Sequence, residues 1–168
     1  ALKAAAAATA AAVAGAATAI GALTTKAIEG YAAQEQLVGG VETLFKTSSD
    51  TVVGYANDAY KTAGMSANEY METVTSFSAS LLASMNNDTA AAAEKANVAI
   101  TDMSDNANKM GTDISLIQNA YNGFAKQNYT MLDNLKLGYG GTKEEMQRLL
   151  DDASKLSGIK YDISSYSD

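Results

Sequence analysis

Apolar and polar residues alternate with helical spacing along most of this 168-residue chain. Spacings of three and four residues recur in four separate stretches, and this is the period of an amphipathic helix. The clearest stretch contains Ala93, Ala96, Ile100, Met103, Ala107 and Met110. The chain contains no proline, a residue that ends helices and punctuates loops. The pattern predicts an all-α fold of long helices and helical hairpins, extended or bundled, with no sheet.

Residue types that start and stop helices divide the chain further. Ser66 to Glu69 and Thr142 to Glu145 are capping boxes, and Asp88 and Asp113 are further predicted caps. A short helix is expected over 48–64, capped by Ser49 or Asp50. Gly64, Gly111 and Gly158 are predicted helix ends, because glycine adopts the left-handed conformation readily. The residues expected to be buried are Tyr70, Val74, Phe77, Leu81, Met85, Ile114, Ile117, Tyr121, Phe124, Met146, Leu149, Leu150, Ala153 and Leu156.

The first part of the chain, residues 1–47, is predicted to be a long Ala-rich apolar helix. Residues 4–25 carry no charge, and they are numerous enough to cross a bilayer as a helix. Small residues at four-residue intervals would let helix backbones approach closely. The predicted packing residues are Ala11, Gly15, Ala19, Ile20 and Leu23. Two interpretations stay open: self-association in water, for which we expect a homotrimer, or insertion into a membrane.

Two glycine clusters are predicted hinges. The chain is also predicted to divide into three segments. A seven-residue apolar spacing continues from residue 20 to residue 44, and the Gly39-Gly40 pair interrupts it with a predicted hinge or helix end. The sequence LGYGGT at 137–142 is a predicted loop with hinge residues Gly138, Gly140 and Gly141. The segments are therefore 1–47, the helical part 48–136, and 137–168, which holds a hinge, a helix and the lead-in to another helix.

Composition excludes several classes of function. The net charge is −7, the sequence pI is near 4.5, and the twelve basic residues are scattered. Sequence-specific binding to nucleic acid is therefore not expected, because neutralising phosphates requires clustered basic residues. Cysteine and histidine are both absent, which excludes disulfides, histidine bases and the usual structural zinc sites.

Three motifs resemble chemical sites without meeting their requirements. GYGGTK lacks the Gly-Lys-Ser/Thr order of a phosphate-binding loop. The segment from Asn106 to Ile117 lacks the glutamate that ends a calcium loop. The pairs Glu144-Glu145 and Asp151-Asp152 are adjacent residues on a helix, so their side chains diverge. The sequence predicts no enzyme, no cofactor and no metal site.

The segment from Asn97 to Ser164 closely resembles the tape measure (minor tail) proteins of long-tailed phages of Gram-positive bacteria. The most specific string is FAKQNYTMLDNLKLGYGGTKEEMQRLL, residues 124–150. The similarity extends upstream through 35–46 and 59–82, so it covers about three-quarters of the chain.

The resemblance implies a structural protein of the virion that lies in the lumen of the phage tail. Such proteins set tail length during assembly and assist genome ejection. The implied partners are other copies of the chain, tail tube proteins and tail tip proteins, with transient contact to the host membrane. An alternative function is a membrane-active helical segment that forms or lines a conduit for DNA. Cell-wall hydrolysis, found elsewhere in some members, has no matching residues here, so the resemblance transfers no catalytic residue.

Overall fold

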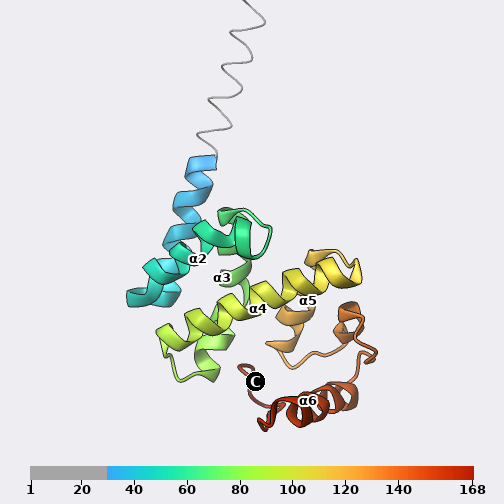
Figure 1. The fold of residues 1–168 in the computed structure, drawn as a ribbon. Coiled ribbons are helices and arrows are strands. Elements are labelled where there is room, and N and C mark those ends of the chain that lie inside the picture. Colours follow the sequence, from blue (N-terminus) through green and yellow to red (C-terminus); the bar gives the residue numbers. More distant parts are fainter. Residues whose placement is uncertain (1–29) are drawn as a thin grey trace, which may run out of the picture. The chain divides into compact units, whose positions relative to one another are not determined.

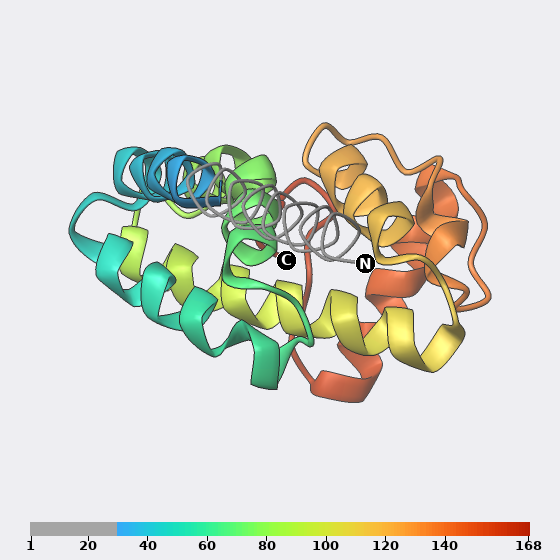
Figure 2. The same ribbon diagram turned by 90° about the horizontal axis from the view of Figure 1, so that it is seen from above.

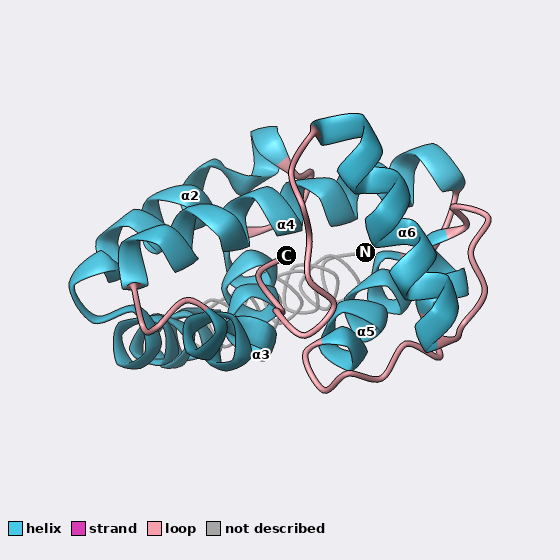
Figure 3. Cartoon of the chain, turned by 90° about the horizontal axis from the view of Figure 1, so that it is seen from below, coloured by secondary structure: helices cyan, strands magenta, loops and turns pink. Residues whose placement is uncertain are grey.

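The computed structural model of the chain describes residues 30–168, and within this range it contains helices and connecting loops but no strand (Figures 1 and 3). The all-α prediction is confirmed. The longest element, α4, has 22 residues, so the described part holds no long extended helix. The elements after the helix at 30–45 are η1 (Lys46–Ser48), α2 (Ser49–Thr62), α3 (Ala67–Ser84), α4 (Thr89–Met110), α5 (Ile114–Phe124), η2 (Leu132–Leu135) and α6 (Lys143–Ser157).

The predicted packing residues of the N-terminal segment lie outside the described residues. These are Ala11, Gly15, Ala19, Ile20 and Leu23. The chain divides into the units Ala1–Leu37 and Val38–Asp168, and the second of these contains the packed helices.

The predicted helix end at Gly39 and Gly40 is wrong. Both glycines lie inside the helix at 30–45, which continues to Phe45. Val41 and Phe45, one helical turn apart, are fully buried. Burial of two large apolar side chains contributes roughly 3–6 kcal/mol, which exceeds the cost of about 2 kcal/mol for two glycines in a helix. Among the described positions of the seven-residue pattern only Val41 is fully buried, and Phe45 lies outside that pattern. Packing of these two side chains decides the conformation.

The start of α2 also differs from the prediction. Neither Ser49 nor Asp50 caps it, because both lie within the helix and α2 follows directly on η1. Ser48, the residue before it, makes a hydrogen bond of 3.0 Å to the Thr89 hydroxyl instead. The 3₁₀ turn therefore leads one helix into the next without a capping side chain.

Most other helix ends are formed as predicted. The Ser66 hydroxyl accepts a hydrogen bond from the Glu69 N–H at 3.2 Å, and Asp88 accepts from the N–H groups of the first turn of α4. Asp113 caps α5 and Thr142 caps α6 in the same way. The predicted terminal glycines, Gly64, Gly111 and Gly158, have φ values of 65°, 62° and 74°. Local capping chemistry thus sets these boundaries.

Helix α4 is the centre of the packing in Val38–Asp168. It packs against α2, α3, α5 and both 3₁₀ turns, as the views in Figures 1 and 2 show for the neighbouring helices. Ile100 and Met103 of α4 are fully buried. The Tyr70 hydroxyl from α3 is also taken into the packing and donates to the Asn97 side chain at 2.9 Å. Burial raises the pKa of Tyr70, so this hydroxyl keeps its proton and remains a donor.

The C-terminal region departs most from the sequence pattern. Leu156 was expected to be buried, but it is 91% exposed near the end of α6. Residues 161–168, the expected lead-in to a further helix, form turns. Asp162 accepts hydrogen bonds from the N–H and hydroxyl of Ser164, and this local Asx-type turn competes with helical backbone pairing.

Candidate functional site

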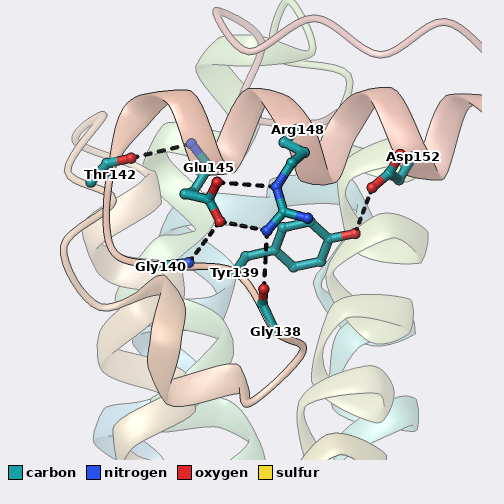
Figure 4. Close-up of polar contacts among 7 residues, drawn as sticks. All are labelled: Gly138, Tyr139, Gly140, Thr142, Glu145, Arg148 and Asp152. Carbon is teal, nitrogen blue, oxygen red and sulfur yellow. Dashed lines mark hydrogen bonds and ion pairs between the residues drawn. The ribbon is translucent and has the colours of Figure 1, made fainter.

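The region with the most elaborate arrangement of side chains is the Gly-rich loop, residues 136–142, together with helix α6. Figure 4 shows that side chains of α6 point back at the loop. The Glu145 carboxylate accepts from the Gly140 N–H at 3.0 Å, and the Glu145 N–H donates to the Thr142 hydroxyl at 3.2 Å. Of the predicted capping box, the Thr142 hydroxyl caps the start of the helix, and the Glu145 carboxylate bonds to the loop.

Arg148, one turn further along α6, ties the loop to the same carboxylate. Its guanidinium donates to both Glu145 oxygens, at 3.0 and 2.6 Å, and to the Gly138 carbonyl at 3.0 Å. The guanidinium carbon lies 4.3 Å from the centroid of the Tyr139 ring, within reach of a cation–π interaction. The Tyr139 hydroxyl donates to Asp152 at 3.0 Å. The contacts hold the loop and α6 together as one piece (Figure 4).

The predicted hinge residues Gly138, Gly140 and Gly141 do lie in a loop, as expected. Gly141 also packs closely against the backbone of Thr130. A Cβ atom built on it would lie 2.3 Å from the Thr130 carbonyl oxygen, much closer than atoms can approach. In this structure, therefore, the loop is packed against the segment before η2 and pinned by α6. Gly141 lets the loop backbone lie close to the Thr130 backbone, and Gly138 adopts a left-handed conformation with φ of 84°.

The acidic side chains of this cluster give the fold a dependence on pH. The hydrogen bond from Arg148, and then that from Gly140, lower the pKa of Glu145, while Lys155 and Tyr139 lower the pKa of Asp152. A carboxyl group with a lowered pKa in the folded state stabilises it at neutral pH, and this stabilisation is lost as the pH falls through that pKa.

We expect Glu145→Gln to lower the free energy of unfolding at pH 7 by more than it does in acid, because the stabilisation from the wild-type carboxylate decreases as that group gains its proton. Urea unfolding between pH 7 and pH 3 measures the difference. Glu144→Gln, at an exposed neighbour on the same turn, is the matched control. A Glu145→Gln effect that is constant across this range would contradict the assignment.

An apolar groove of about 430 Å³ lies beside this cluster, between α6 and the helices of the core. Its walls come from α3, α4, α5, α6 and the segments that follow α5 and α6. Most of the lining side chains are aliphatic or aromatic, and the polar ones are few. The apolar lining consists of Phe77, Leu81, Val98, Ala99, Tyr121, Phe124, Tyr129, Leu135, Leu137, Met146, Leu149, Leu150, Ala153, Tyr161, Ile163 and Tyr166.

Residues 159–168, which we call the strap, follow α6 as a loop (Figure 3). Several of them line this groove. The Tyr166 hydroxyl donates to the Tyr121 carbonyl of α5 at 3.1 Å, and the Tyr129 hydroxyl donates to the Ile163 carbonyl at 3.3 Å. The strap therefore connects the end of α6 to α5 and to the turn after α5.

The phenol groups at the groove have pKa values above the ordinary value for tyrosine. Burial, with a smaller effect of the Asp102 charge, raises the pKa of Tyr121 to about 12. Burial also raises the pKa of Tyr129 and of Tyr166. The Tyr129 and Tyr166 hydroxyls therefore act as hydrogen-bond donors to backbone carbonyls at neutral pH.

The sequence identified the loop and the apolar face of α6, but it did not identify the side chains that join them. Arg148 was not singled out in the sequence, and Tyr139 and Asp152 were considered only within motifs that lack chemistry, although the four-residue spacing of Arg148 and Asp152 could have placed them on one helical face. In each adjacent carboxylate pair one member bonds to the loop: Glu145 accepts from Gly140, and Asp152 accepts from Tyr139. The other members, Glu144 and Asp151, are exposed. Within residues 30–168 no group of three or more acidic side chains is placed to hold a metal ion.

The membrane prediction concerned residues 4–25, which lie outside the described part. In the helices from residue 30 onward, none combines the length and the hydropathy that a bilayer span requires. Comparisons of the chain with protein-family models, with curated proteins and with solved structures found no match.

Proposed function

We propose that this chain is a structural segment of a phage tail tape measure protein, which sets tail length during assembly and assists genome ejection from the tail lumen. Its partners are other copies of the chain, in a homotrimer, together with tail tube and tail tip proteins. The observation that carries the proposal is the specific string at residues 124–150.

The contacts made by that string support a structural role. Gly141 lies close to the Thr130 carbonyl, and the Asn128 carbonyl lies close to Gly123, the residue just before the string. Tyr139 and Arg148 hold the loop to α6. The string therefore uses its glycines for close backbone packing and uses Tyr139 and Arg148 to fix the loop conformation. These uses are what a structural role requires.

The fold also changes the length of tail that such a segment is expected to account for. A continuous helix over Val38–Asp168 would extend roughly 200 Å, at 1.5 Å per residue. The chain instead reverses at the turns after α2, α3 and α4, and successive helices pack together. A segment that stays folded in this way contributes far less than its contour length.

An alternative function is that of a membrane-active segment that forms or lines a conduit for DNA passage through the host envelope. It is supported by the uncharged run at 4–25. The two functions are compatible within one protein, because the first uses the helices after residue 30 and the second uses the residues before them.

In-frame deletion of residues 88–136 in a phage that carries this sequence tests the first function. The deletion removes about 49 residues, or roughly 74 Å of continuous helix. We expect tails that are shorter by less than this ceiling, because α4 and α5 are separate helices that pack against each other. Tail lengths measured in electron micrographs give the deficit.

A matched control replaces 88–136 by an unrelated helical hairpin of the same length. If the segment acts through its dimensions, this control restores most of the lost length. Tails of normal length after the deletion would contradict a ruler role for this region, and complete loss of tails would indicate an assembly role instead.

A further inference from the structure

A second cavity lies where the turn between α2 and α3 meets the C-terminal part of α4, and it shares no lining residue with the apolar groove. Its volume is about 280 Å³. Pockets for drug-sized molecules measure roughly 300–1,000 Å³, so this cavity suits a smaller ligand. Its polar lining side chains are Glu69, Ser104, Asn108 and Thr112, and we therefore call it the polar pocket.

The charge of the polar pocket is negative, because Glu69 is the one charged side chain of the described residues that lines it. In a complete capping box the Glu69 carboxylate would accept from the Ser66 N–H. Among the hydrogen bonds of residues 30–168 only the other half is formed, in which the Ser66 hydroxyl accepts from the Glu69 N–H. The ion pairs in this part of the chain use other carboxylates. The Glu69 carboxylate is therefore available to a cation.

Two hydroxyl groups at the polar pocket supply the second observation. Thr112 is only 9% exposed, and its hydroxyl oxygen has no hydrogen-bond partner among residues 30–168. Buried hydroxyls are nearly always paired, so an unpaired one at a pocket indicates a missing ligand atom. The Ser104 hydroxyl donates its proton to the Ala63 carbonyl at 2.7 Å, which leaves its oxygen as an acceptor. The pocket thus offers acceptors to a ligand that donates hydrogen bonds.

The number of carboxylates decides which class of cation fits. Ca²⁺ takes about six to eight oxygen ligands, commonly from several carboxylates. The polar pocket supplies one carboxylate, and residues 30–168 contain no group of three or more acidic side chains placed around a metal. A primary ammonium group carries one positive charge and three N–H donors, and it has no acceptor. It matches the single charge of Glu69, while Met65 and Ile114 in the lining suit a short alkyl chain.

We propose that the polar pocket binds a small primary alkylammonium ion. The ammonium group donates to the Glu69 carboxylate and to the hydroxyls of Ser104 and Thr112, and the alkyl chain lies against Met65 and Ile114. The proposal is independent of the tape measure function, since it uses only the residues that line this pocket.

Titration of the full chain, labelled with ¹⁵N, with n-butylammonium chloride tests the proposal by NMR. The backbone amide signals of Gly64 and Thr112, which line the pocket, should shift and saturate. We expect a dissociation constant on the order of 1 mM for so small a ligand. Butyltrimethylammonium has the same charge and alkyl chain but no N–H donor, so it should bind at least about tenfold more weakly.

Two substitutions separate the charge of the pocket from its hydroxyl groups. Glu69→Gln removes the negative charge and should weaken butylammonium binding by about tenfold or more. Thr112→Val keeps the shape of the side chain and removes the hydroxyl, so it should weaken binding by roughly fivefold. The thermal unfolding midpoint of Thr112→Val should not fall, because the variant leaves no unpaired hydroxyl in the fold. Lost affinity in a folded, equally stable chain then reports on the ligand contact.

The matched control is Glu72→Gln, at an exposed position one turn further along α3 that does not line the pocket. It should leave the dissociation constant unchanged within about twofold, because a distant exposed charge is screened by salt. The proposal is overturned if Glu72→Gln and Glu69→Gln weaken binding equally, or if Thr112→Val leaves the affinity unchanged. It is also overturned if butyltrimethylammonium binds as well as butylammonium, or if Ca²⁺ saturates the same signals at lower concentration than the amine does.

Discussion

Replacing Ile100 by alanine is expected to destabilise the folded chain by about 3 kcal/mol, within the range of 2–5 kcal/mol for large-to-small changes in a core. Ile100 is fully buried in α4, the helix that packs against most of the other described elements. The change leaves a cavity at the point where these helices meet, and the surrounding helices cannot all move to close it. Urea unfolding followed by circular dichroism measures the loss.

The matched control for this substitution lies two residues earlier on the same helix. Val98 is 55% exposed, so Val98→Ala removes little buried surface and replaces a β-branched residue with a better helix former. We expect its effect on the free energy of unfolding to be within about 0.5 kcal/mol of zero. Equal losses from the two variants would show that α4 is not the packed centre described above.

Replacing Gly141 by alanine is expected to cost about 3 kcal/mol for a different reason. The added Cβ would lie 2.3 Å from the Thr130 carbonyl oxygen, and the next-nearest atoms are also backbone. Backbone cannot rotate out of the way as a side chain can, so the loop must separate from the segment before η2. The same unfolding measurement applies.

Gly54→Ala is the control for the alanine change at Gly141. Gly54 lies within α2, and a Cβ built on it meets nothing within 4 Å. Alanine should therefore stabilise the chain there by up to about 1 kcal/mol through its helix propensity. The expected effects of the two substitutions have opposite signs. A neutral Gly141→Ala would mean that the close approach to Thr130 is not a property of the folded chain.

The parts of the fold that depend on neighbouring residues were predictable from sequence. The caps at Ser66, Asp88 and Thr142 and the terminal glycines Gly111 and Gly158 need only a few adjacent side chains, and all five are found where they were expected. The period of three and four in α4 likewise placed its buried face correctly.

The parts that depend on distant residues were not predictable in this way. Helix propensity predicted a break at Gly39 and Gly40, but burial of Val41 and Phe45 maintains the helix. Helical periodicity placed Leu156 on the apolar face of α6, but it cannot specify where along a helix the covering surface stops. The partners of Arg148 and Tyr166 are loop and helix carbonyls, whose positions are known only once the chain has folded.

The order in which the helices pack has a consequence for how fast the chain folds. α2 packs on α3, α3 on α4, and α4 on α5, so most of the core joins segments that are neighbours in sequence. Helical proteins with mainly local contacts fold quickly, because only short loops must close before packing begins. The chain also has no prolyl bond to isomerise slowly. After unfolding, the helices of Val38–Asp168 are therefore expected to refold quickly, without a slow phase from proline isomerisation.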